Sequence, residues 1–143
     1  MRKGYQAAII GTTMLSAVLV PATAEATPSS GASGRIIVQR TIGHTDYILR
    51  EVVLQPGGTT GWHYHDGTLY AFEKAGTLTH NDADCVTGQT YHAGQAFIEP
   101  KGSGNVHIGR NLGTVPVVLE VLYVLPTGSP LSEDAPDPGC GFA

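Results

Sequence analysis

Two histidines, His63 and His65, stand two residues apart in the sequence. Alternate side chains of a β-strand point to the same face, so on a strand both imidazoles would project together. A pair of neutral imidazoles on one face can chelate Zn, Fe, Cu or Ni, but two ligands make a weak site and a third is needed from elsewhere. The alternative is an exposed or hydrogen-bonded pair without a metal. The histidines His44, His80 and His92 are interpreted as turn or loop residues rather than ligands.

The residues around the pair resemble the first motif of the cupin superfamily, which runs Gly, five residues, His-x-His, three or four residues, Glu, six residues, Gly. Gly57 and Gly76 stand at its two glycine positions. Residues 94–111 resemble the second motif, which runs Gly, five residues, Pro-x-Gly, two residues, His, three residues, Asn. The matching residues there are Gly94, Pro100, Gly102, His107 and Asn111, with two extra residues before the histidine. Together the two motifs cover residues 57–111.

This resemblance implies an all-β fold, a single cupin-type jelly-roll β-barrel, with the site inside the barrel. It also implies that His63, His65 and His107 bind a divalent transition metal there. The sequence leaves the identity of the ion open among Fe, Mn, Zn, Ni and Cu.

The glutamate of the first motif does not carry over, because its place falls at Leu69 or Tyr70. Leucine cannot bind a metal, and a neutral tyrosine would do so only weakly, since its ordinary pKa is near 10. Three interpretations stay open. The site has three histidines alone; another carboxylate takes the place of the glutamate, from Glu73, Glu99 or Glu120; or the pocket is vestigial and binds no metal. Glu99 qualifies only if the barrel brings it inward.

Short β-branched runs separated by glycines and prolines follow one another from residue 35 to residue 126. Turn signals recur roughly every eight to twelve residues, which is typical of an all-β sandwich or barrel. Outside the first 26 residues, no stretch has apolar residues at helical spacing over ten or more positions. We therefore expect a barrel domain at 35–126, a flexible lead-in at 27–34 and a Pro-rich C-terminal tail at 127–143.

Residues 1–26 have the parts of a secretory signal peptide. Arg2 and Lys3 give the positive start, residues 7–20 are mostly apolar or small, and small-x-small cleavage sequences lie at 22–24 and 24–26. A membrane anchor is the alternative, but the run is shorter than the roughly 18 residues of a membrane span. We expect a secreted protein, extracellular or in the cell envelope, with no membrane attachment after cleavage.

Cys85 and Cys140 are the only cysteines. In an oxidising compartment an even pair predicts a disulfide, which here would tie the Pro-rich tail back to the barrel. Two free thiols or a thiolate metal site are the alternatives.

The formal net charge is −4, and no basic cluster exists beyond Arg2 and Lys3, so no nucleic-acid partner is expected. The expected partner is a small-molecule ligand or substrate. Arg50 and Arg110 are candidates to bind an anionic substrate, although most arginines in proteins are solvated and bind no ligand. A homodimer is one assembly that the sequence leaves open.

Two functions fit these features. One is a metal-dependent oxidoreductase of dioxygenase type, with Tyr70 or Glu99 as the acid–base groups nearest to the histidines. The other is a non-catalytic module that binds a small ligand in a vestigial, metal-free pocket. The sequence does not decide whether the protein is an enzyme, since one fold hosts many functions.

Overall fold

A computed structural model describes residues 26–142 of the chain. The expected signal peptide, apart from its last residue Ala26, lies outside these residues. The described residues form ten strands: β1 (Ser30–Ile42), β2 (Thr45–Thr59), β3 (His63–Tyr64), β4 (Thr68–Ala75), β5 (Thr77–Asp82), β6 (Gly88–His92), β7 (Ala96–Glu99), β8 (His107–Arg110), β9 (Val117–Pro126) and β10 (Glu133–Asp134). Within this part of the chain, no helix is long and apolar enough to cross a membrane.

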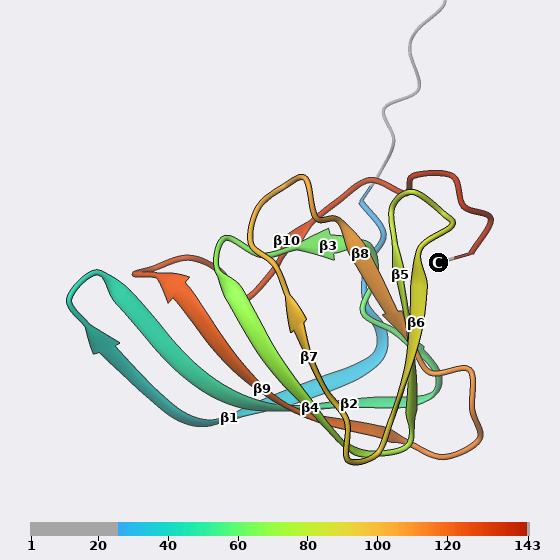
Figure 1. The fold of residues 1–143 in the computed structure, drawn as a ribbon, viewed down its shortest axis with the longest axis horizontal. Coiled ribbons are helices and arrows are strands. Elements are labelled where there is room, and N and C mark those ends of the chain that lie inside the picture. Colours follow the sequence, from blue (N-terminus) through green and yellow to red (C-terminus); the bar gives the residue numbers. More distant parts are fainter. Residues whose placement is uncertain (1–25, 143) are drawn as a thin grey trace, which may run out of the picture.

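All strand pairs are antiparallel, and the strands join in the order β10-β3-β8-β2-β9-β4-β7. β1 pairs with β2, and β5 pairs with β6 and β8. In Figure 1, β1, β2, β9, β4 and β7 form one curved layer, and β3, β8, β5 and β6 lie across from it. The two layers make a nearly closed jelly-roll barrel, so the predicted all-β fold class is confirmed.

Alternation along β9 explains how the barrel core forms. Every second residue of this strand is buried, beginning with Val117 and ending with Leu125. β9 lies between β2 and β4, so its inward side chains pack against those of both neighbours. The resulting core contains Ile48, Leu54, Leu69, Ala71, Leu78, Phe97, Val117, Leu119, Val121, Tyr123 and Leu125.

A second, smaller core lies on the outer side of the site strands. Trp62 and Ile108 are completely buried there, and the Trp62 ring stacks on Phe142 at a centroid distance of 5.9 Å. The Ala135 backbone N–H donates to the Trp62 carbonyl at 2.8 Å. The C-terminal tail therefore packs over this second core and shields it from solvent. Cys85 and Cys140 form the disulfide that the sequence predicts, and it holds the end of the tail to the loop after β5.

The strand boundaries differ from the sequence expectation at two places. β1 begins at Ser30, so residues 30–34 of the expected lead-in are paired with β2. β2 continues through Pro56, Gly57 and Gly58 to Thr59, although glycines and prolines were expected to separate the strands. The reason is a register shift: Ala32 pairs with Leu54 and Ser30 pairs with Thr59, so residues 55–58 bulge out without ending the strand.

Glu73 is an unexpected member of the interior. Its side chain is completely buried, and neither carboxylate oxygen has a well-formed hydrogen bond to a described residue. Burial raises the pKa of the Glu73 carboxyl to about 7, against a smaller opposing effect of the Val118 backbone. It lies outside the histidine cluster, so it does not take the place of the missing motif glutamate.

We predict that Glu73 makes the protein less stable as the pH rises. The pKa is higher in the folded protein, about 7, than its ordinary value of 4.5, so the folded state binds this proton more tightly. The loss of unfolding free energy is absent below pH 4.5, grows between pH 4.5 and about pH 7, and is complete above about pH 7. Urea unfolding should show Glu73→Gln gaining up to about 3 kcal/mol relative to wild type between pH 4.5 and pH 8. A difference that is the same at both pH values would contradict this assignment.

We also predict that the disulfide stabilises the fold substantially. The two cysteines are 55 residues apart in sequence, so the bond restricts a long loop of the unfolded chain. The double variant Cys85→Ser/Cys140→Ser should lose about 2–4 kcal/mol of unfolding free energy in urea. Dithiothreitol should lower the stability of wild type to a similar value and leave the double variant unchanged. Equal stability of oxidised wild type and variant would refute the prediction.

Candidate metal centre

The three histidines expected at the site come together inside the barrel. His63 in β3 and His107 in β8 are direct partners across the strand pair, and His65 follows β3 immediately. All three are buried, and their ring centroids are 4.4–5.2 Å apart. A carboxylate joins them: one ligand atom from each of His63, His65, Glu99 and His107 lies within 4.8 Å of all the others. This is a donor set that could hold a metal ion.

Each of the three imidazoles is held by a backbone carbonyl at its Nδ1 atom. The distances are 2.9 Å from His63 to the Gly61 oxygen, 2.7 Å from His65 to Leu131 and 2.8 Å from His107 to Asn105. A carbonyl only accepts, so Nδ1 must carry the proton and, in the neutral ring, Nε2 presents its lone pair. The Nε2 atoms of His65 and His107 are buried and lack a well-formed hydrogen bond to described residues. Metal-binding histidines characteristically have their second nitrogen fixed in this way.

Two parts of the chain that are remote in sequence provide these carbonyls. Leu131 belongs to the C-terminal tail, just before β10 pairs with β3. Asn105 lies in the longer loop of the second motif, between Gly102 and His107, and its N–H donates to the Gly102 carbonyl at 3.0 Å. The two extra residues of the motif therefore belong to a loop that orients a ligand histidine.

Glu99 takes the place of the missing motif glutamate. It is the last residue of β7, and its partner across the β4·β7 pair is Leu69, where that glutamate was expected. Residues directly opposite each other on antiparallel strands have side chains on the same face of the sheet. Leu69 is buried in the barrel core, so Glu99 also points inward, at the same level of the barrel. In this protein the carboxylate therefore comes from β7, the strand next to the one on which the motif predicts it.

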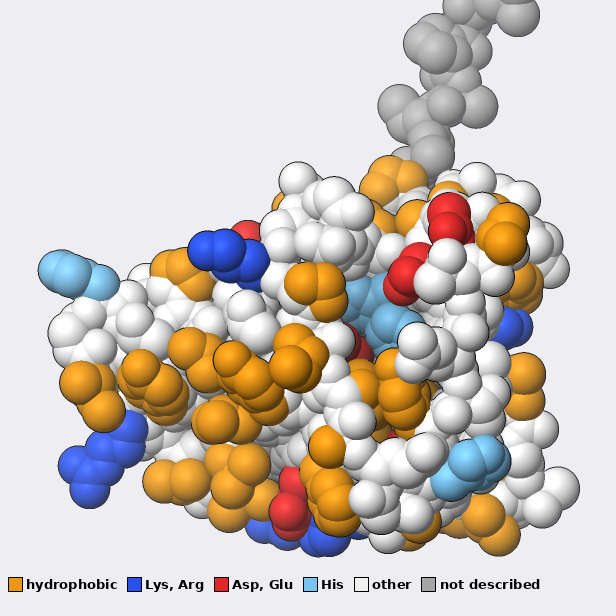
Figure 2. Space-filling view, in the orientation of Figure 1, with side chains coloured by type: hydrophobic (Ala, Val, Ile, Leu, Met, Phe, Trp, Pro, Cys, Tyr) orange, Lys and Arg blue, Asp and Glu red, His pale blue; other side chains and the backbone are white. Residues whose placement is uncertain are grey.

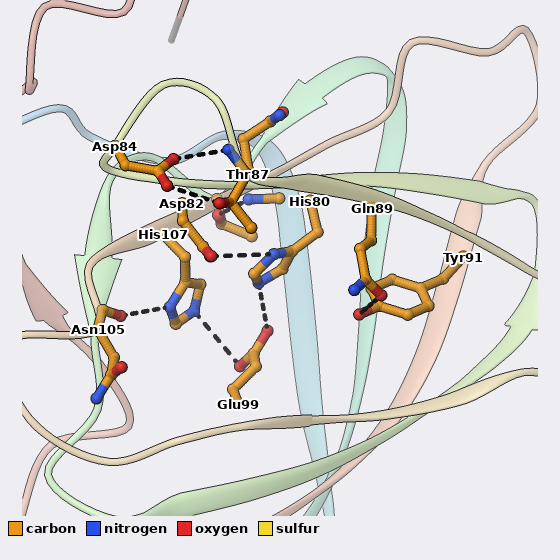
Figure 3. A network of polar contacts seen from close by, with 12 residues as sticks. His80, Asp82, Asp84, Thr87, Gln89, Tyr91, Glu99, Asn105 and His107 are labelled. Atoms are coloured by element: carbon orange, nitrogen blue, oxygen red, sulfur yellow. Dashed lines mark hydrogen bonds and ion pairs between the residues drawn. The ribbon is translucent and has the colours of Figure 1, made fainter.

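The Glu99 carboxylate is surrounded by imidazoles. Its Oε2 lies 3.1 Å from His65 Nε2 and 3.5 Å from His107 Nε2, and its Oε1 lies 3.4 Å from His80 Nε2. Burial alone would raise the pKa of the Glu99 carboxyl, but the close contacts with these three imidazoles hold it well below its ordinary value. Glu99 is therefore an anion at neutral pH. Figure 3 shows it between His107 and His80.

Protonation of the histidines also suits a metal site. Burial, together with the charges of His107 and His65, lowers the pKa of His63 to about 3, so its ring is neutral at physiological pH. Burial acts in the same direction on His107, but the contact that His107 makes with the Glu99 carboxylate, the negative charge of Glu99 and the Asn105 carbonyl together outweigh it and raise the pKa of His107. Without an ion, Glu99 and His107 thus share a proton that a cation would displace.

His80 belongs to this cluster, although the sequence interpretation placed it beside a loop. It lies in β5, its ring stacks on His107 at a centroid distance of 4.8 Å, and its Nδ1 faces Asp82 at 3.9 Å. The alternation of side chains from Thr77 to His80 could have indicated this inward position, because it puts His80 on the same face as the buried Leu78. His80 contacts Oε1 of Glu99, whereas His65 and His107 contact Oε2, and His80 is not one of the four residues whose ligand atoms converge.

Other candidates point away from the site. Tyr70 is about half exposed on the outer face of β4, so its suggested role as a ligand or an acid–base group is wrong. Trp62 packs in the outer core and faces away from the ligand histidines, as strand alternation predicts. Glu120 also faces outward and pairs with Lys74 at 2.7 Å. His44 and His92 are at the surface and away from the cluster.

Cavities flank the cluster on two sides. The larger, of about 380 Å³, reaches His107 and His80 and is lined by Asp82, Tyr91 and Asn105, among others. Figure 2 shows histidine side chains at the floor of a hollow on this face, with acidic side chains beside it. The second cavity, of about 220 Å³, reaches His63 and His65 from the side of β1 and β9. The site is therefore accessible to small molecules from two directions.

The sequence matches the family described as the cupin domain over residues 50–125, more than half of the chain, and the protein belongs to this family. Solved structures agree on the fold. A polyketide cyclase, RemF from Streptomyces resistomycificus, superposes with a TM-score of 0.60 at 16% identity, covering 87% of this chain and 90% of its own. A cupin domain from Bordetella pertussis gives 0.54 at 20% identity, covering 68% and 95%. The Cnp3 cupin domain of Schizosaccharomyces pombe gives 0.58 at 14% identity, covering 68% and 67%. No curated protein matches the sequence.

Proposed function

We propose that this cupin binds a divalent transition metal through His63, His65, His107 and Glu99 and is a metal-dependent oxidoreductase of dioxygenase type. The observation that carries the metal proposal is the set of three Nδ1–carbonyl hydrogen bonds, which turn three Nε2 atoms toward one buried carboxylate. Three imidazoles and one carboxylate suit Fe and Mn as well as Zn, Ni and Cu. A redox-active ion bound here would polarise a small substrate or dioxygen.

The walls around the cluster support chemistry on a small molecule. A space of about 50 Å³ lies beside Glu99 and the first two histidines, and it is lined mostly by apolar residues, including Leu69, Leu78 and Val121. Its apolar walls can contact the apolar part of a small molecule, and Glu99, His63 and His65 form its polar side. The larger cavities on either side leave room for an organic substrate beside it.

The first test is metal content. Mature protein from metal-replete culture should contain about one transition-metal ion per chain by elemental analysis, because three buried imidazoles and the Glu99 carboxylate converge. The double variant His63→Ala/His107→Ala should lose the ion, and Glu99→Gln should bind it about 10- to 100-fold more weakly. The surface variant His92→Ala is the matched control and should retain full metal content. Metal-free wild type whose thermal stability does not change with a chelator would refute the proposal.

The second test exchanges the carboxylate between strands. Since Leu69 and Glu99 are direct partners on one face, a glutamate at either position should reach the three histidines. Glu99→Leu should lose the metal, and Leu69→Glu/Glu99→Leu should recover most of the affinity, measured by competition with a chromogenic chelator. Failure of the double variant to bind better than Glu99→Leu, with both variants folded by circular dichroism, would contradict the equivalence of the two positions.

A second candidate function is a non-catalytic, metal-free binding module. The observation in its favour is that Glu99 already has three imidazole partners without an ion. Oxygen uptake separates the two functions. The metal-loaded enzyme should consume dioxygen with at least one member of a panel of thiols, diketones and phenols, and His63→Ala/His107→Ala should not. A metal-loaded protein that is inert with the whole panel would contradict the oxidoreductase, and a protein that takes up no metal but binds members of the panel would favour the module.

We propose that the protein is exported. The disulfide supports this, since stable disulfides are typical of oxidising compartments, together with the signal-like composition of residues 1–26. The homodimer stays a prediction, which analytical ultracentrifugation would test.

A further inference from the structure

The smaller of the two flanking cavities contains an arginine that the metal site does not use. Arg50 of β2 points to the inner face of the barrel and lines this cavity of about 220 Å³ together with His63, His65 and Tyr123. Two serines, Ser33 and Ser132, add hydroxyl groups to the wall. The cavity thus places a cation and several hydrogen-bond donors beside the two histidines of the first motif.

Arg50 has no carboxylate partner among the described residues, unlike Arg35 and Lys74 on the neighbouring sheet surface. Arg35 pairs with Glu51 at 3.1 Å, and Lys74 pairs with Glu51 and Glu120 at 3.3 Å and 2.7 Å. Asp134 lines the same cavity but lies beyond ion-pair distance of Arg50. A guanidinium that is part-buried and unpaired in a cavity is a ready binding site for an anion.

Arg110, the other arginine considered for an anionic substrate, is already engaged. Its Nη2 donates to the Asn81 side-chain oxygen at 2.8 Å, and its guanidinium lies 3.9 Å from the centre of the Phe142 ring. It therefore holds the C-terminal tail in place, and Arg50 is the arginine available to a ligand.

The neighbouring strands shape the position of Arg50. Gly34 in β1 lies directly against its guanidinium, and a Cβ atom at that position would collide with it. On the other side, Arg50 lies beside the Tyr123 hydroxyl of β9. The phenol of Tyr123, with an ordinary pKa near 10, is protonated at neutral pH and can donate a hydrogen bond. The Tyr123 ring stands edge-on to His65 at a centroid distance of 6.0 Å.

We propose that this cavity binds the carboxylate of a small organic acid through Arg50 and Tyr123, with the rest of the molecule directed at His63 and His65. The proposal rests on the proposed function in taking the histidine cluster as the reactive centre. The planar guanidinium fork matches the two oxygens of a carboxylate. A single arginine with Asp134 at the same cavity favours a monoanion over a phosphate dianion. The volume is below the roughly 300–1,000 Å³ of typical drug-sized ligand sites, which favours a small acid.

Calorimetric titration with benzoate, pyruvate and acetoacetate tests the proposal, using benzamide, pyruvamide and acetoacetamide as neutral counterparts. Each compound is titrated into metal-loaded and chelator-treated protein, and the metal content of every sample is measured. At least one acid should bind at least tenfold more tightly than its amide. Arg50→Met should weaken that acid by about 10- to 100-fold, with Arg50→Lys in between, because the fork and then the charge are lost. Tyr123→Phe should weaken it by a smaller factor.

The control is Arg40→Met, which removes an exposed arginine of β1 and should leave acid binding unchanged. Acid binding that survives Arg50→Met, amides that bind as tightly as their acids, or acids that bind to neither form of the protein would overturn the proposal. Arg50-dependent binding to a protein that never takes up metal would sustain it while refuting the metal function. Metal-loaded protein whose acid binding ignores Arg50 would refute the acid site alone.

Discussion

A carboxylate inside an apolar barrel needs partners, and the Glu99 carboxylate has three imidazoles around it. This constraint organises the site. β4 and β7 pair in the register that turns Glu99 inward opposite Leu69, and β3 and β8 pair so that His63 faces His107. The candidate ligands His63, His65 and His107 are each anchored at Nδ1 by a backbone carbonyl, so the two of them that contact Glu99, His65 and His107, cannot turn their rings away from it. The result is a preorganised group of donors that suits a cation.

The C-terminal tail is part of this organisation. It provides the Leu131 carbonyl that orients His65, a short strand, β10, that pairs with β3, and Phe142, which packs on Trp62. The Cys85–Cys140 bond and the contact between Arg110 and Phe142 hold its end in place. A small barrel has limited apolar area with which to stabilise itself, so a covalent bond that also supports a ligand histidine links the stability of the fold to the site.

The two cavities give the site different chemical surroundings. On one side His80 and Asp82 continue the polar network beyond Glu99, as Figure 3 shows. On the other side Arg50 and Tyr123 provide a positive and hydrogen-bonding wall. An ion held between the two cavities would therefore be reached through an acidic, histidine-rich cavity on one side and through a cavity lined by Arg50 on the other. In the proposed acid site, this polarity would orient a substrate with its anionic end toward Arg50.

The sequence alone determined the all-β class through its turn spacing, the disulfide pair through its two cysteines, and the three histidines through their resemblance to the cupin motifs. The replacement carboxylate, the inclusion of His80 and the difference between Arg50 and Arg110 were decided only by the tertiary structure. Glu99 meets Leu69 through pairing of strands about thirty residues apart, and such long-range register leaves no local pattern in the sequence. The carbonyl of Leu131 is equally invisible, since any residue has one and only folding brings this one to His65. The motif resemblance thus identified the ligand histidines, and strand register completed the site.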